Sequence, residues 1–324
     1  MPFKRLIGFV LICECLFFVD AEMIYAQPTE TEAAAKNVRT KRKPVKKKKE
    51  WGVGLEISGG YDSNIVLEPL TEDLFDDTDS YRLSLGVDAW LRKAKEQNSI
   101  SLRYNGDVDY YDEHSENDFQ AHTASLRFSH KRKPVSYNLR YGYSRYLIDQ
   151  KNFLGFHEIA PSLIWVQTKK RLMISEYCMR IQNYMGVDIK DGLRHTVSLS
   201  EWFFLGNHMK KRLELTLSGG AESVKADHRD YYFAGAGARF LWPLPARINL
   251  DLSVFWQQRF YQKTWDIYGV KERRRLILTQ LKLSRSINRY VKTFIIGGFS
   301  DLDSNITLDE YRKYTASLGI QFIY

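Results

Sequence analysis

The chain has 324 residues, a formal net charge of +9 and a mean hydropathy of −0.41, so it is polar and basic overall. It contains no apolar stretch of about 20 residues, the length that a membrane-spanning helix needs, which excludes a helical membrane protein. A large all-β domain whose interior is polar remains compatible with this composition.

The first residues predict a secretory signal peptide, residues 1–26. Lys4 and Arg5 precede an apolar run, and Ala26 offers a small residue after it. We expect cleavage near Ala26, with Ala21 as an alternative site. The chain is therefore expected to leave the cytoplasm of a Gram-negative bacterium.

Residues 27–50 are rich in lysine and arginine and poor in apolar side chains. Such a segment cannot bury enough apolar surface to fold alone, so we expect a basic disordered periplasmic tail. The tail could bind anionic lipid headgroups or another anionic envelope polymer, or it could be a simple spacer. Nucleic acid is not an expected partner, because the chain is exported. Cys178 is the only cysteine beyond the signal peptide, so no internal disulfide is expected.

From Trp51 to the end, apolar and polar residues alternate with a period of two. In the first run, Trp51, Leu55 and Ile57 share one face, and Glu56 and Ser58 share the other. This alternation is typical of a strand with one apolar face. We predict fourteen such strands, near residues 51–61, 81–91, 100–110, 119–130, 136–147, 157–167, 172–184, 193–204, 212–224, 231–242, 248–260, 273–286, 290–300 and 313–324.

Runs of about 11 residues fit tilted strands that cross a bilayer, and bacterial outer-membrane barrels have an even number of them. Pairing of the last strand with the first leaves no exposed edge. The predicted fold is therefore an all-β, transmembrane, antiparallel up-and-down β-barrel of about 14 strands, spanning residues 51–324. Outer-membrane lipids are its expected surroundings.

The connections between the predicted strands are of two kinds. Short basic connections such as "KRKP" and "TKKR" alternate with longer, more acidic ones such as "DEHSEND", "DQKNFLGF" and "DLDSNITLDE". Outer-membrane barrels have short periplasmic turns and longer surface loops, so we expect both termini in the periplasm and the acidic loops outside. Outward aromatic residues near both strand ends predict two girdles at the membrane surfaces. The terminal aromatics Phe322 and Tyr324 resemble the signal that the barrel assembly machinery recognises.

A barrel of this size is expected to enclose water, and its inward side chains are predicted to be polar. The candidates for lumenal selectivity are Arg82, Arg103, Arg127, Arg140, Arg180, Arg239, Asp107 and Asp109. Strand direction places all of these arginines except Arg82, together with Lys282, in the turn-side half, and the two aspartates toward the surface. The alternation is ambiguous in the strands that hold Arg180 and Lys282. One hypothesis is a cationic vestibule that favours anions. The other is a set of lumenal salt bridges without selectivity.

A short motif recurs near the surface ends of the first and thirteenth strands. It comprises Asp62, Ser63 and Asn64 in "YDSN", and Asp303, Ser304 and Asn305 in "LDSN". Turn chemistry explains both copies simply. Because closure brings the two ends near each other, an alternative is a Ca²⁺ site formed by Asp62, Asp301 and Asp303, or a lateral opening.

The segment "GYDSNIVLEP", residues 60–69, resembles the start of the C-terminal barrel in the surface lipoprotein assembly modifier family. The resemblance covers residues 51–324, but the basic tail stands where that family has a helical repeat domain. It implies a translocator that assists export or surface display of a macromolecule such as a lipoprotein. The alternative is a passive porin for small, perhaps anionic, solutes.

A hydrolase at the barrel rim is a distant third hypothesis. Its candidates are the pairs Asp76 with Asp77 and Asp227 with His228, together with His122 or His195. None of them lies in a recognisable catalytic motif, and isolated charged residues in solvated loops explain them better. We therefore expect no enzyme activity, no catalytic residue, no metal and no cofactor.

Overall fold

The computed structural model of the chain describes residues 50–65, 79–185, 190–206, 210–226, 229–265, 269–306 and 310–324. The predicted signal peptide and all of the predicted tail except Glu50 lie outside these residues. Among the described residues, no helix has the length and apolarity needed to cross a bilayer.

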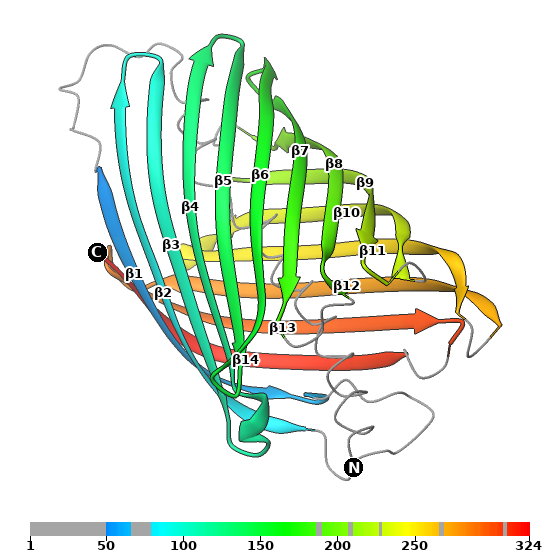
Figure 1. Cartoon of the computed structure of the whole chain (residues 1–324). Helices are drawn as coiled ribbons and strands as arrows, with labels where there is room; N and C mark the ends of the chain where they lie inside the picture. Colours follow the sequence, from blue (N-terminus) through cyan, green and yellow to red (C-terminus); the bar gives the residue numbers. More distant parts are fainter. Residues whose placement is uncertain are drawn as a thin grey trace, which may run out of the picture.

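The described residues form one closed antiparallel barrel of fourteen strands (Figure 1), which confirms the predicted fold. Each strand pairs with its neighbours in the sequence. The strands are β1 Trp51–Asp62, β2 Ser80–Lys95, β3 Asn98–Tyr111, β4 Phe119–Arg132, β5 Val135–Ile148, β6 Lys151–Thr168, β7 Arg171–Tyr184, β8 Gly192–Phe204, β9 Arg212–Val224, β10 Tyr231–Leu244, β11 Ile248–Trp265, β12 Val270–Ser286, β13 Val291–Ser304 and β14 Tyr311–Ile323. The 3-10 turns η1 Ser115–Asn117 and η4 Pro245–Arg247 accompany them among the described residues.

The first and last strands close the barrel along a continuous seam. Their register runs from Gly54 opposite Ile323 to Asp62 opposite Thr315. Beyond it, the backbone nitrogen of Tyr324 donates to the Val53 carbonyl at 2.8 Å. The described part of the seam therefore shows no lateral opening, because its backbone groups are paired across β1 and β14.

We call the end of the barrel that holds Trp51 and Ile323 the turn end, and the opposite end the loop end. At the turn end, β2 and β3, β4 and β5, and β6 and β7 are each joined by two residues. At the loop end, residues 112–118 and 225–230 form longer connections. The predicted alternation of short and long connections is thus present at these positions, with exceptions elsewhere.

The expected loop between residues 260 and 273 is shorter than predicted, because β11 runs to Trp265 and β12 begins at Val270. The larger exception is the expected loop at residues 149–156. Strand β6 begins at Lys151, so only Asp149 and Gln150 form the turn, and the prediction of a long loop was wrong. Both residues have positive φ, 49° and 59°, as the two-residue turns of tight hairpins require. A tight hairpin lets the strands continue past the point where the sequence suggested a loop.

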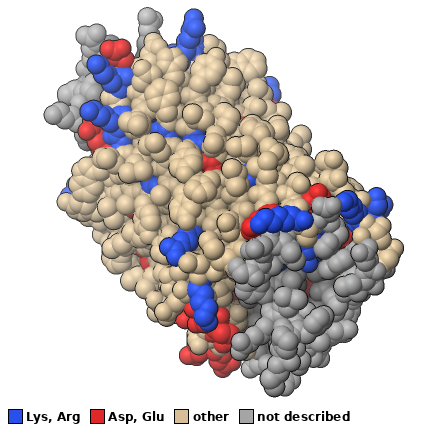
Figure 2. Space-filling view, in the orientation of Figure 1, with Lys and Arg blue, Asp and Glu red and all other residues tan. Residues whose placement is uncertain are grey.

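The outer wall of the barrel presents the apolar face of every strand. Leu217, Leu318 and Ile295 are 63%, 63% and 57% exposed, although they are aliphatic. The predicted aromatic girdles are present at both ends, for example Tyr81 and Tyr314 at the loop end. Figure 2 shows a largely tan surface between charged residues that gather toward the ends of the molecule. This surface suits hydrocarbon flanked by headgroups.

The inner wall is not uniformly polar. Three clusters of buried apolar side chains lie on inward positions, centred on Tyr146 with Phe156, on Leu172 with Trp202, and on Tyr231 with Phe233. They occupy the inner wall between β4 and β11. Side chains therefore fill part of the interior there, and open space is concentrated on the remaining wall.

Two adjacent glycines on β9 provide a test of the described packing. A Cβ on Gly220 would lie 1.9 Å from the His195 carbonyl oxygen, whereas one on Gly219 would meet only the Phe233 carbonyl oxygen at 3.4 Å. We expect Gly220→Val to destabilise the barrel by about 3 kcal/mol, because the strands β8 and β9 must separate. Gly219→Val is the matched control. Denaturant titration should separate the two variants, and equal midpoints would contradict the predicted close approach.

Candidate functional site

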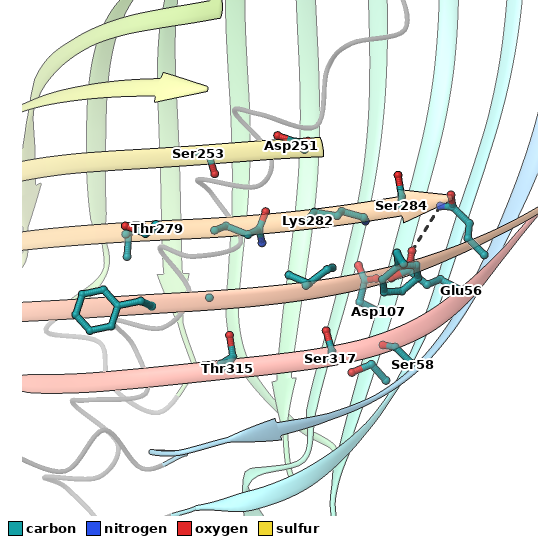
Figure 3. Close-up of a pocket in the computed structure, with 18 of the residues that line it drawn as sticks. Glu56, Ser58, Asp107, Asp251, Ser253, Thr279, Lys282, Ser284, Thr315 and Ser317 are labelled. Carbon is teal, nitrogen blue, oxygen red and sulfur yellow. Dashed lines mark hydrogen bonds between the residues drawn. The ribbon is translucent and has the colours of Figure 1, made fainter. Parts of the chain in front are cut away.

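A cavity of about 990 Å³ lies inside the barrel. Side chains of β1–β5 and β9–β14 line it, and all of those labelled in Figure 3 are polar or charged. They include Ser58 on β1, Ser284 on β12 and Thr315 on β14. The predicted polar lumen is therefore present, although Ala121 of the first apolar cluster also lines it.

Among the described residues, four lysines line this cavity: Lys210, Lys313 and two others that lie on neighbouring strands of its wall. Lys282 on β12 and Lys292 on β13 both line it. The ammonium of Lys282 lies 4.6 Å from the centre of the Phe294 ring. Neither lysine forms an ion pair with any residue that the structure describes. Their charges are therefore available to a solute, unlike those of paired groups.

Besides Asp109 and Asp251, which pair with arginines, two further carboxylates face the same cavity. Glu56 belongs to β1 and Asp107 to β3. Gln321 on β14 donates to Glu56 at 3.5 Å, which Figure 3 marks with a dashed line. The cavity thus has acidic groups on β1 and β3 and lysines on β12 and β13.

Three of the candidate arginines face the lumen in ion pairs. Arg82 contacts Asp109 at 3.3 Å, and Arg103 contacts Asp88 at 2.7 Å. Arg239 makes two contacts with Asp251, at 2.8 and 2.5 Å. Each pair joins neighbouring strands. Each arginine has a carboxylate partner, so these contacts cross-link the wall. The opposite charges largely cancel, so each pair adds little to the electrostatic potential in the lumen.

Arg140 and Arg180 share one buried carboxylate. Glu158 on β6 is 4% exposed, pairs with Arg140 and accepts from Arg180 at 2.9 Å. Arg140 also lies 3.6 Å from Glu176. Arg127, the remaining candidate, is directly opposite Arg140 in the register of β4 and β5.

The predicted depth of Arg180 was wrong. Strand β7 starts at the turn end with Arg171 and finishes at Tyr184, so Arg180 lies in the loop-end half. Its guanidinium packs over the Phe156 ring at 4.2 Å. Arg180 is the tenth of the fourteen residues of β7, counted from the turn end. Its contact with the buried Glu158 shows that it faces inward.

The first copy of the repeated motif caps the end of β1. The backbone nitrogen of Asn64 donates to Asp62 at 3.2 Å, and Ser63 accepts from the backbone nitrogen of Tyr314 at 2.9 Å. Asp62 is fully buried and pairs with Lys313 at 2.7 Å. These contacts are the turn chemistry that the sequence suggested.

The second copy has the same role at the end of β13. Ser304 accepts from the backbone nitrogen of Ile306 at 3.1 Å, and Asn305 accepts from that of Arg273 at 2.7 Å. Asp303 pairs with Arg275 at 2.8 Å.

The alternative of a Ca²⁺ site was wrong. Asp62 points into the barrel, toward Lys313, whereas Asp301 and Asp303 share the outward parity of the exposed Ile295. The three carboxylates therefore lie on opposite faces of the wall and do not converge. In the described part of the chain, no group of three or more His, Cys, Asp or Glu residues is placed to hold a metal ion.

The rim candidates do not assemble a catalytic site among the described residues. His122 contacts the hydroxyl of Tyr104 at 2.8 Å, and His195 contacts that of Tyr177 at 2.6 Å, both on the outer wall. The two pairs of residues 76–77 and 227–228 lie outside the described residues. The hydrolase hypothesis therefore gains no geometric support from His122 or His195.

The terminal aromatics lie on the outer wall at the turn end. Phe322 and Tyr324 are 44% and 65% exposed, and the Tyr324 ring lies 5.5 Å from that of Trp51. Their role in recognition by the assembly machinery stays a prediction.

Comparisons with known proteins agree with this architecture. No family model and no curated protein matches the sequence. Among solved structures, OmpT, an outer membrane protein of Vibrio cholerae in its trimer form, covers 85% of this chain and 98% of its own, with 8% identity and a TM-score of 0.50. The fold is that of an outer-membrane barrel.

A second solved barrel of this fold is an anion-selective porin from Comamonas acidovorans. It is 6% identical, with a TM-score of 0.50, over 84% of this chain and 98% of the porin. At such low identity the two similarities establish the fold alone. Membership of the surface lipoprotein assembly modifier family is not supported by any of these matches.

Proposed function

We propose that this chain is an outer-membrane channel for small solutes that favours anions. The observation that carries the proposal is the pair Lys282 and Lys292, two lysines without ion-pair partners among the described residues, in a polar cavity inside a closed barrel. The arginines that the sequence suggested as selectivity residues are largely compensated by carboxylates. The two lysines therefore carry the preference.

The size of the cavity also favours a small solute. Its volume of about 990 Å³ lies at the upper end of the range typical of small-molecule sites. Ion pairs and aromatic clusters fill the inner wall elsewhere, which leaves less room for a polypeptide. The resemblance at residues 60–69 implies assisted export of a macromolecule, but the described interior fits a diffusing solute better.

The location and orientation belong to the same proposal. The exposed apolar band between two aromatic girdles suits the outer membrane. Short connections are typical of the periplasmic side, so we place the turn end and both termini there. No catalysis is assigned to the chain, and its expected partners are outer-membrane lipids.

Liposome swelling tests the proposed channel against a translocator. Proteoliposomes containing the full mature chain are expected to swell in small sugars and faster in a small sugar acid, because the cavity is polar and its unpaired charges are positive. Protein-free liposomes and a large oligosaccharide are the controls. A complete lack of swelling in small sugars would contradict a passive channel.

A further inference from the structure

The outer wall carries a basic strip at the loop end of three neighbouring strands. We define it as Arg273 and Arg275 on β12 and Arg312 on β14. All three side chains are exposed and share the outward parity of Leu281 and Tyr314. Tyr81 and Tyr232 are uncharged side chains at this level on other strands, and β5 holds one exposed arginine there, Arg145. Positive charge is thus concentrated on one sector of the wall.

Two aspartates of β13 hold the strip in place. Asp303 contacts Arg275 at 2.8 Å, and Asp301 contacts Arg312 at 3.1 Å. The two arginine side chains remain 47% and 46% exposed. A guanidinium has five N–H donors, so each arginine keeps donors that point away from its aspartate. The strip has three arginines and two aspartates, which leaves an excess of positive charge.

Aromatic rings lie directly below the strip. Asp301 is opposite Arg312, and two residues along β13 Phe299 is opposite Tyr314. The two rings are 5.1 Å apart. Because aromatic girdles mark the membrane surface, the strip lies at the depth of lipid headgroups.

A shallow depression follows below the rings. Gly297 on β13 is opposite Ala316 on β14, and both are outward positions. No atom lies within 4 Å of where a Cβ of Gly297 would be. Leu281 is opposite Gly297 on β12 and Tyr61 is opposite Ala316 on β1, so larger side chains flank the two small ones. The depression can take an acyl chain against the wall.

We propose that this sector binds a lipid whose headgroup carries phosphate. The phosphate is held by Arg275 and Arg312, with Arg273 beside them, because guanidinium donors match phosphate oxygens. An acyl chain of the same lipid lies over Gly297 and Ala316. This inference rests on the proposed membrane location but not on the proposed transport. A variant or experiment can therefore disprove lipid binding without disproving conductance, and the reverse.

The charged half of the site is tested with Arg275→Gln/Arg312→Gln. The full mature chain in neutral detergent is mixed with dimyristoyl phosphatidic acid, and bound lipid is counted by native mass spectrometry. We expect the double variant to lose affinity by about tenfold or more, since each charge-assisted contact contributes substantially. Arg171→Gln is the matched control, because Arg171 is also exposed and paired with a glutamate, Glu201, but at the turn end.

The apolar half is tested with Gly297→Phe, which fills the depression. Phosphatidic acid affinity is expected to fall, whereas Val197→Phe, on the outer wall of β8, should leave it unchanged. Inorganic phosphate should displace the lipid poorly. The proposal is overturned if the double arginine variant binds as wild type, if Arg171→Gln loses as much affinity, or if inorganic phosphate displaces the lipid fully. Heat-modifiable migration on gels confirms that each variant is folded.

Discussion

Replacing Glu158 with glutamine is expected to destabilise the folded barrel by about 3–5 kcal/mol. Glu158 is buried and compensates two arginines, Arg140 and Arg180, whose side chains are themselves only 16% and 12% exposed. A neutral amide would leave two buried guanidinium groups with less compensation, and a buried charge without a partner is costly. Denaturant-induced unfolding of the refolded chain in lipid vesicles measures the difference.

The matched control is Glu201→Gln. Glu201 also pairs with an arginine, Arg171, but on the outer wall at the turn end with partners 49% and 30% exposed. An exposed pair of this kind contributes at most about 1 kcal/mol. If Glu158→Gln and Glu201→Gln unfold at the same denaturant concentration, the cross-linking role of the inner ion pairs is refuted.

Replacing both lysines of the cavity with glutamate is expected to invert the ion preference of the channel. In Lys282→Glu/Lys292→Glu, the acidic groups Glu56 and Asp107 would face further acidic groups, and the wall of β12 and β13 would change from positive to negative. Rings or clusters of carboxylates favour cations, as clusters of lysine favour anions. The reversal potential in a salt gradient should therefore change sign.

Lys93→Glu/Lys95→Glu is the control for a general effect of net charge. Both lysines are exposed on β2 at the turn end, at outward positions of the strand. This variant changes the charge of the chain by the same amount but should keep the sign of the reversal potential. A similar shift in both variants would mean that the cavity lysines do not set selectivity.

Strand periodicity predicted most of the fold because a membrane barrel imposes one rule on every strand. One face meets hydrocarbon and the other does not, so alternation survives in residues such as Leu55, Leu217 and Leu318. Closure also followed, since the apolar strand at the end of the chain needs a partner. The girdles were predictable for the same reason, because their depth is fixed by the bilayer.

The interior was less predictable because no comparable rule applies to it. Tyr146, Phe156 and Phe233 are buried inside the barrel, where polar side chains were expected. Where consecutive residues of a strand are all apolar, the sequence does not alternate, so it does not show which of them face the lumen and which face the membrane. Asp149 and Gln150 form a tight turn with positive φ, which allows β5 and β6 to extend up to them. Neither residue is glycine, so the sequence did not indicate this turn.

The candidate site was partly predicted. The arginines were assigned to the lumen by parity, but their carboxylate partners come from neighbouring strands and depend on register, which one sequence does not define. Lys282 was named with an ambiguous face, and Lys292 was missed. A signal for Lys292 existed, since it shares the parity of Phe294 and Ile296, opposite to the outward Ile295. Its lack of an ion-pair partner among the described residues became visible only in three dimensions.

The most direct test is the reversal potential of the wild-type chain in a planar bilayer that separates two concentrations of potassium chloride. The proposed function predicts a steady conductance and a reversal potential on the side of chloride preference, because Lys282 and Lys292 supply the unpaired charge of the cavity. A cation preference, or a folded and inserted barrel that conducts no ions, would contradict it.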